Sequence, residues 1–169
     1  MTTGEISIKY GLKGPNYVTT SACASSSNAI IDAYDQIRLN RADIMIAGGS
    51  EAAVCSSCVG GFNAMHALST RNESPETASR PFSKSRDGFV IGEGAACLIL
   101  EEYEHAVARG AKIYAEIGGA GLTADAYHMT APHPEGEGAL QVMKNAIEES
   151  GLTPEDVDYI NVHGTSTYA

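Results

Sequence analysis

The residue best suited to chemistry is Cys23, a thiol among small neighbours where a β-rich run gives way to a helical pattern. This position lies in the first turn of a predicted helix, where the partial positive charge of the helix terminus favours thiolate over thiol. Small side chains over residues 21–25 leave room for a tight turn and for a substrate. A thiolate so placed suits acyl transfer through a thioester. The alternative is a buried cysteine in a packing contact.

A second candidate is the stretch His163-Gly164-Thr165-Ser166-Thr167, which follows the last predicted strand. A histidine at the carboxyl end of a buried strand lies where α/β folds place their ligands. Its imidazole could donate a hydrogen bond to a thioester carbonyl or exchange a proton, and the hydroxyls could hold a polar ligand arm. A histidine bonded to nearby backbone in a turn is the alternative. Because Cys23 also follows a strand, we expect its thiol and the His163 imidazole to share one crevice.

The remaining motifs give weaker signals. His128 and His133 lie in a loop over residues 125–134, and their spacing fits no familiar metal site, so a structural or substrate-lining loop is favoured. Cys55-Ser56-Ser57-Cys58 is a lone CxxC, for which zinc or redox use is a minor alternative. Gly92-Glu93-Gly94 precedes a strand and lacks a third glycine, so dinucleotide binding is rejected, and the absence of a P-loop motif excludes that phosphate site.

Composition narrows the class of partner. The 169 residues carry a formal net charge of −10, which argues against nucleic acid and anionic membranes. Arg80, Lys84 and Arg86, or Arg38 and Arg41, could form a local basic patch, but we interpret them as scattered solvated charges. The polar start and the lack of a long apolar run indicate a reducing, cytoplasmic setting, in which the four cysteines are free thiols.

Hydrophobic periodicity predicts an α/β fold with strands buried between helical layers. Strands are predicted over residues 16–20, 43–47, 95–100, 112–117 and 157–162, and helices over residues 24–39, 101–109 and 137–150. A single turn is expected at Thr153-Pro154, and residues 69–88 are expected to form a long surface connection.

Taken together, the motifs resemble those of β-ketoacyl-acyl carrier protein synthases of the type II elongating kind, in the thiolase superfamily, from about residue 6 to residue 167. The resemblance implies a three-layer α/β/α thiolase-like fold, here incomplete. The serine at position 166 is more like the pattern of free-standing fatty-acid synthases, since modular polyketide synthases usually carry glycine at this position. The other motifs that carry it are Ser21-Ala22-Cys23-Ala24, Ala47-Gly48-Gly49-Ser50-Glu51, Gly60-Gly61-Phe62, Ala67-Leu68-Ser69-Thr70-Arg71-Asn72, Ser79-Arg80-Pro81-Phe82, Arg86-Asp87-Gly88-Phe89-Val90, Gly92-Glu93-Gly94, Glu101-Glu102-Tyr103-Glu104-His105-Ala106 and residues 125–130.

The resemblance also implies an acyltransferase mechanism. An acyl group passes from the phosphopantetheine thiol of acyl carrier protein to Cys23, and malonyl-carrier protein then loses carbon dioxide and attacks the thioester. The Cys23 amide contributes to an oxyanion hole. His163 is one of two histidines that stabilise the enolate. Thr165 and Thr167 line the phosphopantetheine tunnel, with Thr130 a weaker candidate.

The family pattern also sets expectations about completeness. The second histidine motif and its supporting lysine do not occur here, so we expect a partial chain that is inactive alone. Residues 1–111 would be the latter part of the N-terminal half, and residues 112–169 the start of the C-terminal half. Acyl carrier protein as partner, a homodimer in the full enzyme, and no metal or redox cofactor are also implied. A polyketide ketosynthase, or a non-catalytic subunit like a chain-length factor, is the alternative.

Overall fold

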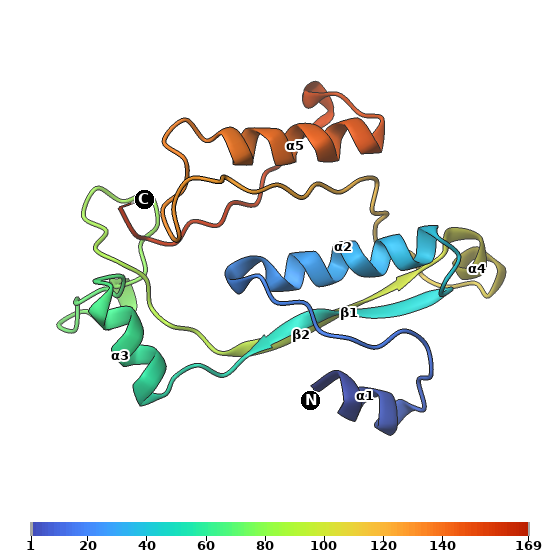
Figure 1. Cartoon of the computed structure of the whole chain (residues 1–169), viewed down its shortest axis with the longest axis horizontal. Coiled ribbons are helices and arrows are strands. Elements are labelled where there is room, and N and C mark those ends of the chain that lie inside the picture. Colours follow the sequence, from blue (N-terminus) through green and yellow to red (C-terminus); the bar gives the residue numbers. More distant parts are fainter. Residues whose placement is uncertain (1, 169) are drawn as a thin grey trace. The chain divides into compact units, whose positions relative to one another are not determined.

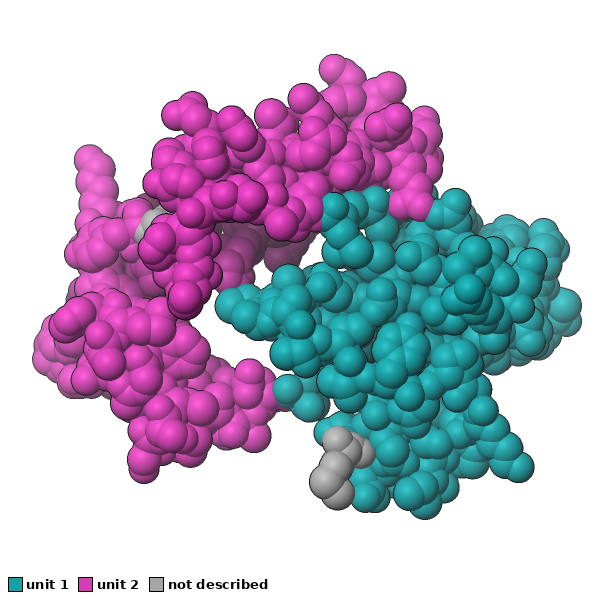
Figure 2. Space-filling view, in the orientation of Figure 1, with its two compact units in different colours: residues 1–50, 95–122 teal, residues 51–94, 123–169 magenta. Residues whose placement is uncertain are grey.

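The computed structural model describes residues 2–168, which form two compact units. Unit 1 runs to Ser50 and resumes over Ala95–Leu122, whereas unit 2 comprises Glu51–Gly94 and the chain from Thr123 onward (Figure 2). Both units are therefore assembled from segments that are distant in the sequence.

Unit 1 is built around two strands distant in the sequence, β1 (Ile44–Glu51) and β2 (Gly94–Glu101), which form a two-stranded sheet (Figure 1). The Glu102 N–H donates to Asp43 at one end, and Gly48 lies against Ala96 at the other, so the strands run antiparallel. Helix α2 (Ser25–Arg38) lies on this sheet, where the Ser26 side chain occupies the space that a Cβ on Gly49 would need. The unit also contains α1 (Thr2–Tyr10), a 3-10 turn (Ala22–Ala24) and α4 (Tyr103–Ala108).

Unit 2 contains α3 (Ser56–Ala64) and α5 (Glu137–Ser150), with 3-10 turns at Pro75–Thr77 and Pro154–Asp156. A parallel bridge joins Leu68 to Phe89, and the ring of Phe89 meets that of Phe62 edge-on, with centroids 5.1 Å apart. Gly88 beside this bridge has φ +138°, and a Cβ there would lie 2.4 Å from the Leu68 carbonyl carbon. Only glycine fits that crossing.

The helix predictions are confirmed, together with the two strands that pair. Helix α5 has the predicted bounds, and Gly151 ends it in the left-handed conformation with φ +70°. Helices α2 and α4 lie within the ranges expected for them, as do the central residues of β1 and β2. The single turn after Thr153 is also present.

Three predicted strands are wrong: residues 16–20, 112–117 and 157–162 are assigned to no strand. Their sequences have the apolar character of strands, but a strand exists only where a neighbouring chain accepts its hydrogen bonds. The sequence pattern shows which side chains are apolar, but it does not show whether a neighbouring strand is present to pair with.

The prediction that the strands are buried between helical layers is wrong for both strands: in β1 only Ala47 is buried, and the residues of β2 from Gly94 to Ile99 are exposed. Ile99 is 67% exposed, so residues 2–168 leave its side chain uncovered. Within residues 2–168 the buried positions are all glycine, alanine or serine: Ala33, Ala47, Ala78, Gly88, Ala106, Gly138 and Ser166. No helix in this part of the chain has the length and apolarity needed to cross a membrane.

Candidate active site

Cys23 lies in unit 1, in the middle of the 3-10 turn that leads directly into α2. Its side chain is exposed and the thiol is free. The predicted placement at the start of a helix is therefore confirmed, and the alternative of a buried packing cysteine is wrong for this structure.

The turn that carries Cys23 is fixed by Ser25. The Ser25 hydroxyl accepts a hydrogen bond from the Ser21 N–H at 2.8 Å and donates one to the Ala22 carbonyl at 2.7 Å. The Asn28 amide donates to the Ser21 hydroxyl at 2.7 Å. One hydroxyl thus joins two backbone groups that precede Cys23, which fixes the backbone from which the thiol projects.

Ala22, immediately before the thiol, has φ +50°, in the left-handed region. This conformation costs an L-residue about 1–2 kcal/mol, because its Cβ approaches the following carbonyl oxygen. Strained backbone of this kind persists where surrounding contacts over-determine it and is concentrated at functional sites. The hydrogen bonds of Ser25 are contacts of that kind.

His163, Thr165 and Thr167 lie near the end of unit 2, in a segment without regular secondary structure. His163 is exposed, and the two threonines are half-buried with their Oγ1 atoms 2.6 Å apart. The structure therefore brings the two threonine hydroxyls together as a pair that presents both a donor and an acceptor. Gly164 between them and the histidine has φ +43° and lies against the Phe82 ring.

Ser166 anchors this segment, and its hydroxyl is buried in a contact with the protein's own backbone, so the expectation that it holds a polar ligand arm is wrong for this serine. It is 3% exposed and has φ +67°. Its hydroxyl accepts a hydrogen bond from the Arg80 N–H at 3.2 Å, and its carbonyl accepts one from the Gly88 N–H at 2.9 Å. The Arg86 guanidinium donates to the next carbonyl, that of Thr167, at 2.6 Å. Residues 80–88 thus hold the backbone between the two threonine hydroxyls.

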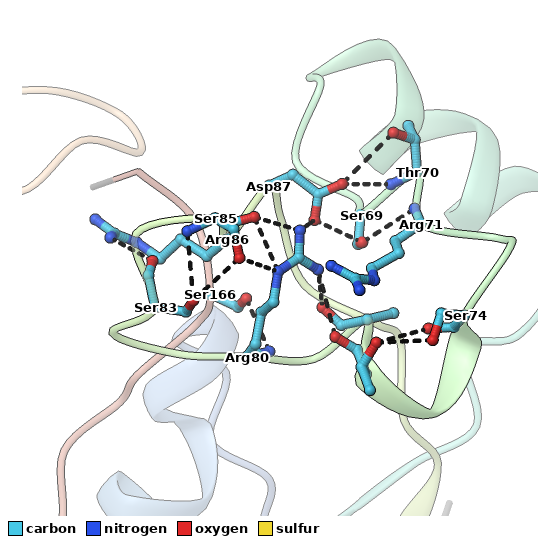
Figure 3. A network of polar contacts seen from close by, with 12 residues as sticks. Ser69, Thr70, Arg71, Ser74, Arg80, Ser83, Ser85, Arg86, Asp87 and Ser166 are labelled. Atoms are coloured by element: carbon cyan, nitrogen blue, oxygen red, sulfur yellow. Dashed lines mark hydrogen bonds and ion pairs between the residues drawn. The ribbon is translucent and has the colours of Figure 1, made fainter.

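Residues 80–88 are themselves ordered by an ion pair between Arg80 and Asp87, with 3.0 Å between nitrogen and oxygen (Figure 3). Asp87 also accepts hydrogen bonds from the Ser69 hydroxyl at 2.7 Å and the Thr70 N–H at 3.1 Å. The Ser69 hydroxyl, with smaller contributions from Thr70 and Arg80, lowers the pKa of Asp87. The interpretation of Arg80 and Arg86 as scattered solvated charges is therefore wrong, since both are committed to this network.

Thr130 is exposed, in the loop before α5 that sequence analysis proposed as structural or substrate-lining. The Nδ1 atom of His128 accepts the N–H groups of Thr130 and Ala131 at 3.2 and 3.1 Å, and Asp125 accepts the His133 N–H at 2.9 Å. Both histidines therefore take part in the loop's own hydrogen bonds. No cluster of three or more metal-ligating side chains occurs among residues 2–168.

The five predicted site residues belong to both units. Cys23 lies in unit 1, whereas His163, Thr165, Thr167 and Thr130 lie in unit 2, so a shared crevice for the thiol and the imidazole stays a prediction. The supporting roles of Ser25, Ser166, Arg80 and Asp87 are not predicted by the sequence patterns described above. The available signal was the pair of motifs Ser79-Arg80-Pro81-Phe82 and Arg86-Asp87-Gly88-Phe89-Val90.

Comparison with known proteins agrees with this geometry. The family described as "Beta-ketoacyl synthase, N-terminal domain" matches residues 1–106, and "Beta-ketoacyl synthase, C-terminal domain" matches residues 114–169. The chain is 57% identical over 169 residues to the 3-oxoacyl-(acyl-carrier-protein) synthase 2 of Coxiella burnetii, and 51% identical to the mitochondrial 3-oxoacyl-(acyl-carrier-protein) synthase of Arabidopsis thaliana. These matches cover 100% and 99% of this chain but 41% and 36% of the relatives.

Solved structures give the same result. A β-ketoacyl synthase from Burkholderia phymatum superposes with a TM-score of 0.92 at 46% identity, covering 98% of this chain and 40% of that one. A type II polyketide ketosynthase, solved in a complex of acyl-carrier protein with its ketosynthase, gives 0.94 at 42% identity, covering 98% and 41%. The expected fold class, an incomplete thiolase-like α/β fold, is confirmed by this similarity. The chain belongs to the β-ketoacyl synthase family.

Proposed function

We propose that the protein carrying this chain is a 3-oxoacyl-(acyl-carrier-protein) synthase of fatty-acid elongation. The observation that carries the proposal is an exposed thiol on a pinned turn at the start of α2, in a chain 57% identical to a relative of that name. The reaction is a decarboxylative Claisen condensation of an acyl thioester on Cys23 with malonyl-acyl carrier protein.

The reaction has two stages. In the first, the Cys23 sulfur forms a bond to the acyl carbonyl carbon, and the bond to the pantetheine sulfur breaks as that thiol departs with a proton. In the second, the malonyl carboxylate leaves as carbon dioxide, and the resulting enolate carbon attacks the Cys23 thioester and displaces the thiolate. The Cys23 N–H stabilises the oxyanion, and His163 stabilises the enolate oxygen by donating a hydrogen bond.

The hydroxyl pair of Thr165 and Thr167 is suited to the amide groups of a phosphopantetheine arm. Two hydroxyls 2.6 Å apart offer both a donor and an acceptor, which is what an amide requires. Thr130 is proposed as a further contact of the same arm. We also propose acyl carrier protein as partner, a homodimeric full-length enzyme in the cytoplasm, and chemistry without a metal or redox cofactor.

We place the boundary between the two halves of the ketosynthase near Ala111. The ranges matched by the two family descriptions end at residue 106 and begin at residue 114, which supports that position. Residues 1–111 would then belong to the N-terminal half and residues 112–169 to the C-terminal half.

The second candidate is a ketosynthase of polyketide assembly, which the similarity to the type II polyketide enzyme supports. The identity of 42% to that enzyme is lower than the 57% to the fatty-acid synthase, and serine at position 166 also favours the fatty-acid pathway. A non-catalytic chain-length-factor role is disfavoured because it would leave the Cys23 thiol without use.

The test is acyl transfer and condensation by the full-length protein, with acyl-carrier and malonyl-carrier substrates. We expect an acyl group on the peptide that contains Cys23, and loss of condensation by at least about a thousandfold in C23S. Cys97→Ser is the matched control, since that thiol is also exposed in unit 1. His163→Ala should still accept the acyl group but fail to condense it. An acyl group on another residue, or full activity of C23S, would refute the proposal.

A further inference from the structure

Two further thiols stand at the start of α3, outside the proposed site. Cys55 is the residue that precedes the helix, with extended backbone at φ −137° and ψ 160°, and Cys58 is the third residue of its first turn. Both thiols are free, Cys55 is exposed, and Cys58 is half-buried. They form a pair of nucleophilic groups to which the condensation reaction assigns no task.

The contacts of the pair distinguish an attacking from a resolving thiol. The Cys55 sulfur lies 3.4 Å from the Ser57 hydroxyl. That hydrogen bond, with smaller contributions from Cys58, lowers the pKa of Cys55 to about 7. The hydrogen bond between the two thiols and the negative charge on Cys55 raise the pKa of Cys58, and Glu51 adds to this effect. At neutral pH the exposed sulfur is therefore a substantial fraction thiolate, while its neighbour keeps its proton.

The geometry permits a bond between the two sulfurs. Residues three apart on a helix have Cβ atoms about 5–6 Å apart, and a disulfide needs about 3.5–4.5 Å. Cys55 lies before the helix with extended backbone, so its Cβ is not held at the helical spacing, and the hydrogen bond between the two thiols brings their sulfurs together. The Val59 N–H donates to the Cys55 carbonyl at 2.9 Å.

We propose that Cys55 and Cys58 form a reversible dithiol–disulfide site that exchanges with low-molecular-weight disulfides such as oxidised glutathione. The Cys55 thiolate attacks one sulfur of that disulfide, the S–S bond breaks, and one small thiolate leaves and takes up a proton. Cys58 then loses its proton and attacks the Cys55 sulfur, which displaces the second small thiol. The protein loses two electrons and two protons, and the small disulfide is reduced to two thiols.

The proposed exchange uses other cysteines than the proposed nucleophile. Cys23 and Cys97 belong to unit 1, whereas Cys55 and Cys58 belong to unit 2 and are three residues apart in the chain. An exchange confined to Cys55 and Cys58 can therefore be measured in a protein without Cys23, whether or not the condensation proposal holds.

The experiment uses the full-length protein with Cys23→Ser and Cys97→Ser, treated with oxidised glutathione at neutral pH. We expect the mass of two hydrogens to be lost, the peptide over residues 55–58 to carry the disulfide, and dithiothreitol to restore both thiols. Adding Cys58→Ser should stop the reaction at one glutathionyl group on Cys55, and Cys55→Ser should leave Cys58 unmodified.

Ser57→Ala tests the cause of the reactivity, with Ser56→Ala as its matched control on the same turn. The alkylation rate of Cys55 should rise with a midpoint at about pH 7 in the parent protein, and S57A should move that midpoint upward. If a multiple variant fails to fold, peptide mapping of the oxidised wild-type protein gives the same information. Free thiols at both positions after treatment, or a disulfide that joins either cysteine to another partner, would overturn the proposal.

Discussion

The Ser166 hydroxyl accepts a hydrogen bond from the Arg80 N–H at 3.2 Å, across 86 positions of the chain. The serine that makes this contact has φ +67° and is 3% exposed. Ser166 therefore combines a strained backbone conformation with a buried hydrogen bond. In the sequence it lies between Thr165 and Thr167, whose hydroxyl oxygens are 2.6 Å apart.

Two substitutions at this residue separate strain from hydrogen bonding. Ser166→Ala keeps the left-handed conformation but leaves the Arg80 N–H without its acceptor, so we expect a loss of about 1 kcal/mol in stability. Ser166→Gly loses the same bond but relieves about 1–2 kcal/mol of strain, so its stability should stay close to that of the parent. Chemical denaturation of the full-length protein measures both. An alanine variant as stable as the glycine variant would contradict this account.

The carboxylate of Asp87 orders residues 80–88 through Arg80, Ser69 and Thr70. Asp87→Asn replaces one acceptor oxygen by a donor, so the loop that holds Ser166 should loosen. We expect kcat/KM for the carrier-bound substrate to fall on the order of tenfold, mainly through KM, because a displaced binding group costs affinity and positioning. Glu76→Gln, which removes an exposed charge but keeps an acceptor oxygen for the Ser74 hydroxyl, is the matched carboxylate-to-amide control and should leave the kinetics unchanged.

The Ser25 hydroxyl positions Cys23 through the backbone: it bonds to the two residues before the cysteine and not to the Cys23 sulfur. Ser25→Ala removes the hydrogen bonds to the Ser21 N–H and the Ala22 carbonyl, so the turn should sample other conformations. We expect acylation of the thiol to slow on the order of tenfold, while the stability falls by only about 1 kcal/mol. Ser27 is an exposed serine on the same helix, so Ser27→Ala should change neither the acylation rate, measured by quenched acyl transfer, nor the stability, measured by denaturation. Equal rates for the two variants would remove the positioning role.

Ala22 offers a test of the strain beside the thiol. Ala22 has φ +50°. Ala22→Gly should therefore leave the stability of the protein unchanged or raise it by up to about 1 kcal/mol, whereas Ala22→Val should lower it by more than about 1 kcal/mol. The β-branched side chain is the least able to adopt this backbone conformation. Denaturation midpoints of the two variants check the order, and a valine variant as stable as the glycine variant would show that the turn relaxes.

Sequence analysis predicted α5 with its correct bounds and located α2 and α4, because helices are specified by local periodicity and end signals such as Gly151. It failed for residues 112–117 and 157–162, whose apolar pattern indicates strands but cannot supply a hydrogen-bonding neighbour.

The candidate site likewise divides into features set by neighbouring residues, which the sequence predicts, and features set by distant contacts, which it does not. The thiol of Cys23 was found from its neighbours in the chain, and Thr165 and Thr167 from their place after a strand-like run. The support from Arg80 and Asp87 was not found, because the contact to Ser166 spans 86 positions and no local pattern reports it.

Glu101, at the end of β2, links the strand to α4 through both oxygens and gives a prediction about pH. The Arg109 guanidinium donates to its two oxygens at 2.7 and 2.6 Å, and the His105 Nδ1 lies 2.6 Å from one of them. Arg109, and to a smaller extent His105, lowers the pKa of Glu101 from 4.5 to about 2.

Because the folded protein holds this carboxyl ionised below its usual pKa, its stabilising contribution is present above about pH 4.5 and is lost as the pH falls toward about 2. We therefore expect wild-type protein to have a higher denaturation midpoint than Glu101→Gln at pH 7, and the gap to close between about pH 4.5 and 2. Glu104→Gln, on the first turn of α4, is the control and should give no such gap. A gap that stays constant down to about pH 2 would mean that the residue acts through packing of its side chain and not through its charge.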